Sequence, residues 1–196
     1  MNLNQLQPYL PTNASIYIEK WIETYPLTLK ITKSRATKLG DYRKINSGRR
    51  HQITINGDLN PEAFFFVLTH EIAHMVVYAK YAHHEVNPHG KEWKNAFRQL
   101  LLDSYSIYPE NLQPHILNHA KSPKASVGAD RGIAKFVIND SKDNQDYLED
   151  LELGAIFRIS NKILQKGEKI KLRYICCEVK TQKKYLVNAS ALVEKL

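Results

Sequence analysis

The first third of the chain contains one helical and three strand-like hydrophobic patterns. Residues 13–25 carry apolar side chains at helical spacing, which predicts an amphipathic helix. Three short segments follow, in which apolar and polar side chains alternate as they do in half-buried strands. These predicted strands are residues 27–32, 40–45 and 50–56.

The longest predicted helix covers residues 60–81. Asn60 is a favourable N-cap, and Pro61 suits the first helical position because its missing N–H has no partner there in any case. The stretch AFFFVL, residues 63–68, is apolar on every side of the helix. A helix with this pattern is buried on most of its surface.

A second helix is predicted after the dipeptide Asn87-Pro88. A residue before proline avoids the α conformation, so the first helix ends before this point. The apolar face of the second helix consists of Trp93, Ala96, Phe97, Leu100 and Leu101.

The rest of the chain divides by composition. Residues 139–154 are polar and acidic, whereas the tail alternates like strands joined by hairpins. We therefore expect an α+β domain over residues 1–120, a linker or irregular segment over 121–153, and a small basic β-rich unit over 154–196. In the first domain a small antiparallel or mixed sheet packs on the buried helix and on the second helix.

Composition narrows the class of protein. The chain has 196 residues, is 43% hydrophobic and carries a formal net charge of +8. It has no apolar run of about 18 residues, so no membrane span is expected, and its first residues do not resemble a signal peptide. Cys176 and Cys177 are adjacent, which suits neither a disulfide framework nor a four-cysteine zinc site and favours a reducing, cytoplasmic setting.

Five of the eight histidines lie between Thr69 and Trp93. His70 and His74 are four residues apart, so both project from one face of the helix and can bind one ion at about 2.0–2.1 Å, the usual zinc–nitrogen distance. Glu71 is rotated away from His70 and could accept a proton from water at the metal, which is why His-Glu-x-x-His is a signature of zinc hydrolases. The alternative is a chance pair of core histidines, which would bury polar groups without partners.

A catalytic zinc ion needs a third protein ligand and an open position. His83 and His84 would lie about 13–15 Å from His74 along a continuous helix, too far to share an ion. We interpret them as exposed histidines near the helix end. His89 follows the chain reversal at Asn87-Pro88 and can fold back, so we predict it as the third ligand. The candidates considered were His83, His84, Glu85 and His89.

The span from about Leu27 to Phe97 resembles the SprT-like family, which includes the DNA-dependent protease Spartan. That family has a small sheet, a His-Glu-x-x-His helix, and a third histidine in a His-Gly-x-x-aromatic motif that opens the next helix. This sequence has HEIAH, then HGKEW, with His89 fifteen residues after His74. The resemblance covers about the first 110 residues.

This resemblance implies that His70, His74 and His89 bind zinc and that Glu71 is the general base of a metalloendopeptidase acting on proteins near or on DNA. Many bacterial members end in a four-cysteine zinc ribbon, but this chain has two cysteines, so a second zinc ion is not expected. The rival interpretation is a non-catalytic, zinc-stabilised nucleic-acid-binding or adaptor protein.

Four further residues are candidates for supporting roles. Glu92 could orient a ligand imidazole, or it could be an acidic residue that favours the start of a helix. Tyr42, Tyr78 and Arg98 are candidates for stabilising the transition state.

The basic residues concentrate in the tail. From residue 155 onward ten bases and three acids leave a charge of about +7, nearly the whole net charge. Lys169, Lys171 and Arg173 alternate with apolar residues, which predicts a strand with one basic face. Such a face could bind DNA through its phosphates, and the alternative is an ordinary solvated surface.

Overall fold

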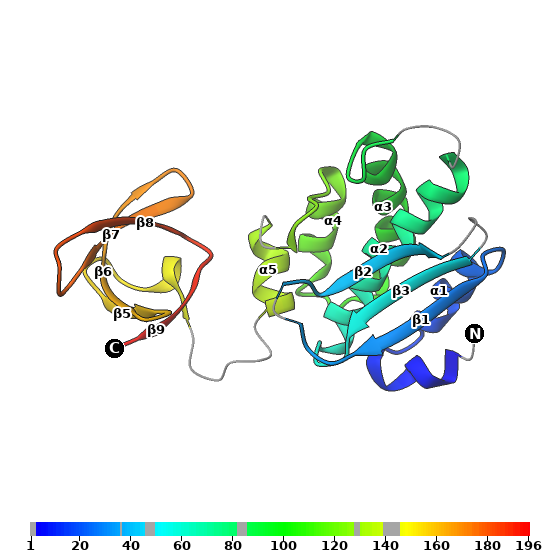
Figure 1. The fold of residues 1–196 in the computed structure, drawn as a ribbon, viewed down its shortest axis with the longest axis horizontal. Coiled ribbons are helices and arrows are strands. Elements are labelled where there is room, and N and C mark those ends of the chain that lie inside the picture. Colours follow the sequence, from blue (N-terminus) through cyan, green and yellow to red (C-terminus); the bar gives the residue numbers. More distant parts are fainter. Residues whose placement is uncertain (1–2, 36, 46–49, 82–85, 128–129, 139–145) are drawn as a thin grey trace. The chain divides into compact units, whose positions relative to one another are not determined.

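The computed structural model describes residues 3–35, 37–45, 50–81, 86–127, 130–138 and 146–196. The chain forms two compact units, Met1–Asp140 and Ser141–Leu196, and each is described by itself (Figure 1). The segment predicted as a linker, 121–153, contains a helix of the first unit and the first strand of the second.

The first unit contains a three-stranded sheet whose strands are the three that the sequence predicts. The strand order is β1-β3-β2, with β1 parallel and β2 antiparallel to the central β3, so β2 forms an edge. This mixed sheet and the surrounding helices confirm the α+β class. The elements up to the sheet are the 3₁₀ helix η1 (Leu3–Tyr9), α1 (Ala14–Ile22), β1 (Leu27–Thr32), β2 (Gly40–Ile45) and β3 (Arg50–Asn56).

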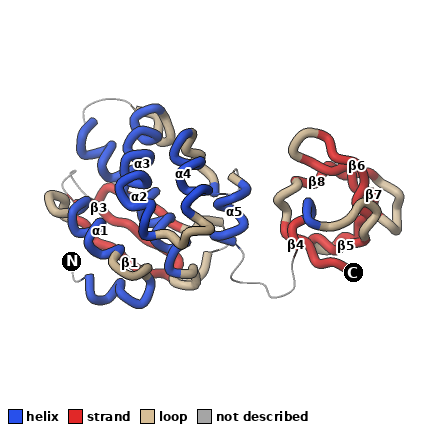
Figure 2. The backbone as a smooth tube through the Cα atoms, turned by 180° about the vertical axis from the view of Figure 1, so that it is seen from behind, coloured by secondary structure: helices blue, strands red, loops and turns tan. Residues whose placement is uncertain are grey.

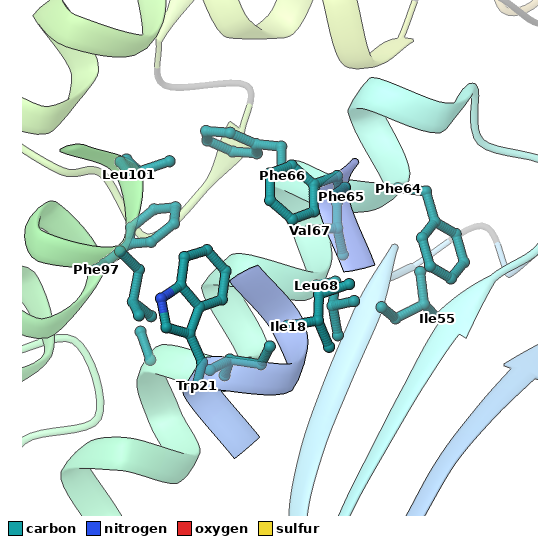
Figure 3. Close-up of a cluster of buried hydrophobic side chains, with 14 of the residues drawn as sticks. Ile18, Trp21, Ile55, Phe64, Phe65, Phe66, Val67, Leu68, Phe97 and Leu101 are labelled. Carbon is teal, nitrogen blue, oxygen red and sulfur yellow. The ribbon is translucent and has the colours of Figure 1, made fainter. Parts of the chain in front are cut away.

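The helix α2 (Pro61–Tyr81) passes through the centre of this unit. The side chain of Asn60 accepts a hydrogen bond from the N–H of Ala63 at 2.7 Å, as expected of an N-cap. Phe64, Phe65 and Phe66 are all buried, because α2 packs against β2 and β3 and is covered by other helices (Figure 3). Burial of the apolar half of α2 in the core therefore fixes the position and orientation of the helix.

Helices packed on α2 complete the first unit (Figure 2). The predicted second helix is α3, and its residues Trp93, Phe97 and Leu101 are buried. The sequence did not place the helices that follow, which are short and mixed in composition. These elements are α3 (Lys91–Ser104), η2 (Tyr105–Ile107), α4 (Gln113–Lys121) and α5 (Arg131–Ile138).

The second unit is a six-stranded antiparallel sheet in the order β4-β9-β5-β6-β7-β8. Its core contains Leu148, Phe157, Leu164, Cys176 and Val193, so the β-rich C-terminal unit is confirmed. The elements are β4 (Asp146–Tyr147), η5 (Leu148–Asp150), β5 (Ile156–Ile159), β6 (Lys162–Ile170), β7 (Arg173–Glu178), β8 (Lys184–Asn188) and β9 (Leu192–Lys195).

The prediction that Lys169, Lys171 and Arg173 share one strand face is wrong. Strand β6 ends at Ile170 and β7 begins at Arg173, so Lys171 and Leu172 form a hairpin turn. Lys171 adopts a left-handed conformation with φ 53°, which sequence analysis expects of glycine or asparagine. The three bases therefore gather around one hairpin tip.

Candidate metal centre

Three histidine side chains meet at one point beside α2. The Nε2 atoms of His70 and His74 are 3.3 Å apart, and the Nε2 atom of His89 lies 3.4 Å and 3.1 Å from them. Among the described residues these three form the one group of His, Cys, Asp or Glu side chains arranged to hold a metal ion. The predicted ligand set is brought together. His83, His84 and Glu85 lie outside the described residues.

The geometry of this triangle suits a cation better than mutual hydrogen bonding. A neutral Nε2 atom has either one hydrogen or one lone pair, so three of them cannot satisfy one another. Three nitrogens bound to a tetrahedral ion at about 2.0–2.1 Å are about 3.3–3.4 Å apart. The three separations in the structure, 3.1–3.4 Å, are close to this value.

The electrostatic environment keeps the imidazoles neutral. Burial, together with the neighbouring His74, His89 and His119, lowers the pKa of His70 to about 3. Burial and His89 together lower the pKa of His74 to about 4. The pKa of His89 is also lowered by burial. Neutral imidazole is the form that binds metals, so protons compete weakly for this site near pH 7.

A short turn and one tryptophan bring His89 to the helix. The N–H of Gly90 donates to the carbonyl of Asn87 at 2.9 Å, which closes the turn that carries His89. Trp93 then packs its buried ring against all three imidazoles, with centroids 4.7 Å from His70 and His89 and 5.4 Å from His74. Its indole N–H donates to the carbonyl of His70 at 3.4 Å. Sequence analysis placed Trp93 in the core but missed its position beneath the site.

Glu71 lies beside the triangle and is buried. The backbone N–H of Tyr42 on β2 donates a hydrogen bond to its carboxylate, which favours the charged form. Burial outweighs this contact, and with the nearby charge of Asp41 it raises the pKa of Glu71 to about 8. The carboxylate is therefore held in place and made unusually basic.

Gly40 allows β2 to approach Glu71 this closely. A Cβ atom at Gly40 would lie 2.6 Å from Glu71 Oε1 and 2.7 Å from Val67 Cγ1. Both distances are shorter than real carbon contacts allow, so a larger residue must displace the carboxylate or the strand. No sequence signal pointed to this glycine.

We expect Gly40→Ala to destabilise the fold by about 1–3 kcal/mol, the usual range for overpacking. The three histidines do not contact Gly40, so the bound metal should remain. Thermal unfolding and metal analysis of the purified variant measure both effects. Lys44→Ala, an exposed change on the same strand, is the control. Equal stability of the Gly40→Ala variant and the control would contradict this packing.

A cavity of about 930 Å³ opens onto the histidine triangle and Glu71. Its walls include the start of β2, the segment 86–89 and Ala125–Val127. Tyr42 and Tyr78 also line it, as expected of residues near a reaction centre. Arg98 does not: it donates to the carbonyls of Ala120 and Lys121, at 2.8 and 2.9 Å, and so fixes the end of α4.

A polar network around Arg35 fixes the part of the cavity wall that precedes β2 in the chain. Sequence analysis did not predict this network. Arg35 donates to the side chains of Asn56 and Thr54, at 2.8 and 2.9 Å. Asn56 in turn donates to the carbonyls of Arg35 and Lys38. These bonds fix the connection between β1 and β2, which contributes Lys38 and Leu39 to the cavity.

An α+β domain with two histidines and a glutamate on a buried helix, and a third histidine after a turn, defines a candidate metal centre of the His-Glu-x-x-His class. The model of the SprT-like family matches residues 19–110, which confirms over this part of the chain the resemblance that its motifs predicted. No curated protein and no solved structure gives a significant match. None of the described helices is long and apolar enough to cross a membrane.

Proposed function

We propose that the protein is a zinc-dependent metalloendopeptidase. The observation that carries this proposal is the position of Glu71 beside the histidine triangle, within a cavity large enough for a polypeptide segment. The match to the SprT-like family over residues 19–110 is consistent with a hydrolase of this type.

The residues divide the chemistry between them. A zinc ion held by His70, His74 and His89 would polarise the scissile carbonyl and make water at the metal more acidic. Glu71 takes the proton from the attacking water and delivers it to the leaving amine. A general base works best when its pKa is near the working pH. In the metal-free chain burial raises the pKa of Glu71 to about 8, and a cation held by the three histidines would lower it from that value.

The edge of β2 that faces away from β3 pairs with no other described strand and offers a place for an extended substrate. The N–H of Asn56 donates to the carbonyl of Leu39 at 2.9 Å, which sets the antiparallel ladder between β3 and β2. Alternate residues of β2, beginning with Gly40, therefore direct their backbone groups away from β3. Tyr42 uses its N–H on Glu71, so a substrate strand on this edge lies next to the general base.

The rival function is a structural metal site in an adaptor or nucleic-acid-binding protein. Structural zinc sites are closed by four protein ligands. Here the described residues contribute three ligands, and the cavity borders them. This arrangement favours catalysis. Cleavage of an unfolded protein by the zinc-loaded chain, compared with Glu71→Gln, tests the proposal.

DNA remains the proposed second partner, through Lys169, Lys171 and Arg173. Their clustering around the β6–β7 hairpin tip, together with a tail charge of about +7, suits a polyanion. We expect reversal of all three to glutamate to weaken DNA binding. The slope of log affinity against log salt should fall by about two to three units, since each lost phosphate contact removes about 0.7–0.9.

Fluorescence anisotropy over a salt series measures this change. Reversal of Lys180, Lys183 and Lys184 at the other end of the same sheet alters the net charge equally and is the matched control. If the wild-type chain binds no DNA at low salt, the partner is wrong. If both triple variants weaken binding equally, the hairpin tip has no special role.

A further inference from the structure

The cavity beside the metal centre has one wall from a part of the chain far from the metal motifs. Ala125–Val127, between α4 and α5, line the same cavity as Phe66 and Val67 of α2. Val67 approaches Gly40 together with Glu71, so it lies next to the proposed general base. The cavity therefore has apolar surface close to the reaction centre.

A buried histidine and an aspartate hold the chain on both sides of Ala125–Val127. His119, in the last turn of α4, contacts Asp130 with its Nδ1 atom 2.9 Å from Oδ2. The other ring nitrogen, Nε2, accepts the backbone N–H of Lys124 at 3.4 Å. The N–H of Asp130 donates to the carbonyl of Val127 at 3.2 Å. One imidazole thus contacts Lys124 on one side of Ala125–Val127 and Asp130 on the other.

Both anchors are themselves fixed to the rest of the unit. The ring of His119 packs against Phe66 and Phe97, with centroids at 5.3 and 5.7 Å. Asp130 also accepts the N–H of Ile133 at 3.4 Å and so caps α5. Because a buried imidazole without partners is costly, loss of the bond to Asp130 should release the connection rather than leave it unchanged.

The charges in the cavity do not favour a charged substrate side chain. Lys38 and Asp41 pair with each other at 2.9 Å. Glu71 is bound by the Tyr42 amide. Apart from the histidines, the ionisable Lys, Arg, Asp or Glu side chains among the described residues that line the cavity are Lys38, Asp41 and Glu71. Each of them already has a polar partner.

We propose that Ala125–Val127, held by the His119–Asp130 pair, form one wall of a subsite that takes an apolar substrate side chain next to the scissile bond. This inference rests on the proposed peptidase function and specifies its substrate class. Val127 is a specificity-determining residue, and His119 and Asp130 are positioning residues. An apolar pocket discriminates side chains by about 10–200-fold for differences as small as one methylene.

Two peptide series test the wild-type preference. Each series varies one residue, on one or the other side of the scissile bond, among Leu, Ala, Asp and Lys. We expect the zinc-loaded chain to cleave the Leu peptide of one series with a kcat/KM about 10–100-fold above its Asp and Lys peptides. Zinc-loaded Glu71→Gln should bind the peptides in the same order. Flat profiles in both series would overturn the inference.

Substitution of the wall should change that preference. Val127→Asp should reduce the Leu-to-Lys ratio at least tenfold, because the new carboxylate opposes apolar contact and attracts a cation. Val179→Asp is the matched control, since Val179 is 45% exposed in the second unit, and it should leave the ratio unchanged. If the Val127→Asp variant does not fold, the isosteric Val127→Thr takes its place in the test. We expect it to reduce the Leu-to-Lys ratio less, by about threefold to tenfold. An unchanged ratio in a folded Val127 variant would overturn the inference.

A pair of substitutions at Asp130 separates positioning from capping. A serine hydroxyl can still accept the Ile133 N–H and cap α5 but does not reach His119, whereas the single side-chain oxygen of asparagine can accept the His119 N–H in place of the cap. Asp130→Ser should raise KM for the Leu peptide and lower the Leu-to-Ala ratio about fivefold or more, while Asp130→Asn retains the wild-type ratio. Equal ratios in both variants would remove the positioning role.

Failure of this inference can be told from failure of the proposed function. If the Glu71→Gln variant binds Leu peptides selectively but the wild type cleaves no peptide, the peptidase function fails and the subsite stands. If the wild type cleaves all peptides equally, the peptidase function stands and the subsite fails. If the chain neither binds nor cleaves any of them, both fail.

Discussion

Glu71→Gln should lower the rate of peptide hydrolysis by about 10²–10⁴-fold, the range that general acid–base catalysis contributes. Glutamine has the size of glutamate and can occupy the space beside Gly40, but it cannot take the proton from the attacking water. The three imidazoles do not depend on the carboxylate, so metal content should be the same as in the wild type.

The measurement is the cleavage rate of an unfolded protein by zinc-loaded wild type and variant at equal metal content. A chelator should abolish wild-type cleavage, and added zinc should restore it. Gln113→Ala changes a residue that does not line the cavity, so it controls for effects of substitution and purification on the cleavage rate. Cleavage by Glu71→Gln at the wild-type rate would end the general-base role and favour another base in the cavity.

The same substitution should change the pH dependence of stability in the metal-free chain. The pKa of Glu71 is raised from 4.5 to about 8, so the folded state favours the protonated carboxyl. Its contribution to stability is full below pH 4.5 and is lost as pH rises through 8. Glutamine does not titrate, so the variant should gain stability relative to the wild type between these pH values. The same difference in melting temperature between the variant and the wild type at pH 5 and at pH 9 would contradict this prediction.

His89→Ala should weaken zinc binding by more than about a hundredfold. Loss of an outer-sphere partner alone costs 10–100-fold in metal affinity, and loss of a ligand should exceed this. His89 is the one ligand that does not come from α2, and its Nε2 atom lies within 3.4 Å of both others. Without it, two nitrogens from one helix face remain.

Competition with a chromophoric zinc chelator measures the affinity directly. His84→Ala is the comparison, because His84 was the alternative ligand on sequence grounds. Full zinc retention in His89→Ala, together with loss in His84→Ala, would overturn the assignment. Retention in both would indicate that the ion binds elsewhere.

Local sequence patterns predicted the elements that carry the site. The cap at Asn60 and the apolar run after it defined α2, and the spacing of His70 and His74 placed both imidazoles on one face. The chain reversal at Asn87-Pro88 was sufficient to predict that His89 folds back toward His70 and His74. Each of these signals lies within about one or two helical turns of the residue it concerns.

Contacts between distant segments could not be predicted in this way. Gly40 meets Glu71, and Arg35 meets Asn56, only because the sheet brings these segments together. The His119–Asp130 contact depends on how two short helices pack, which no pattern within either helix specifies. The hairpin at Lys171 was missed because a lysine occupies a conformation that is usually glycine's.

The return of His89 to α2 has a consequence in chain entropy. An ion bound by His74 and His89 closes a loop of 15 residues, as a covalent cross-link would. In a disulfide, closing a loop of that length removes about 3 kcal/mol of unfolded-chain entropy at 25 °C. Such an ion would therefore act as a reversible cross-link between α2 and the turn that precedes α3. A chain that lost such an ion would have a weaker connection between these helices, so we expect metal depletion to lower the free energy of unfolding as well as the activity.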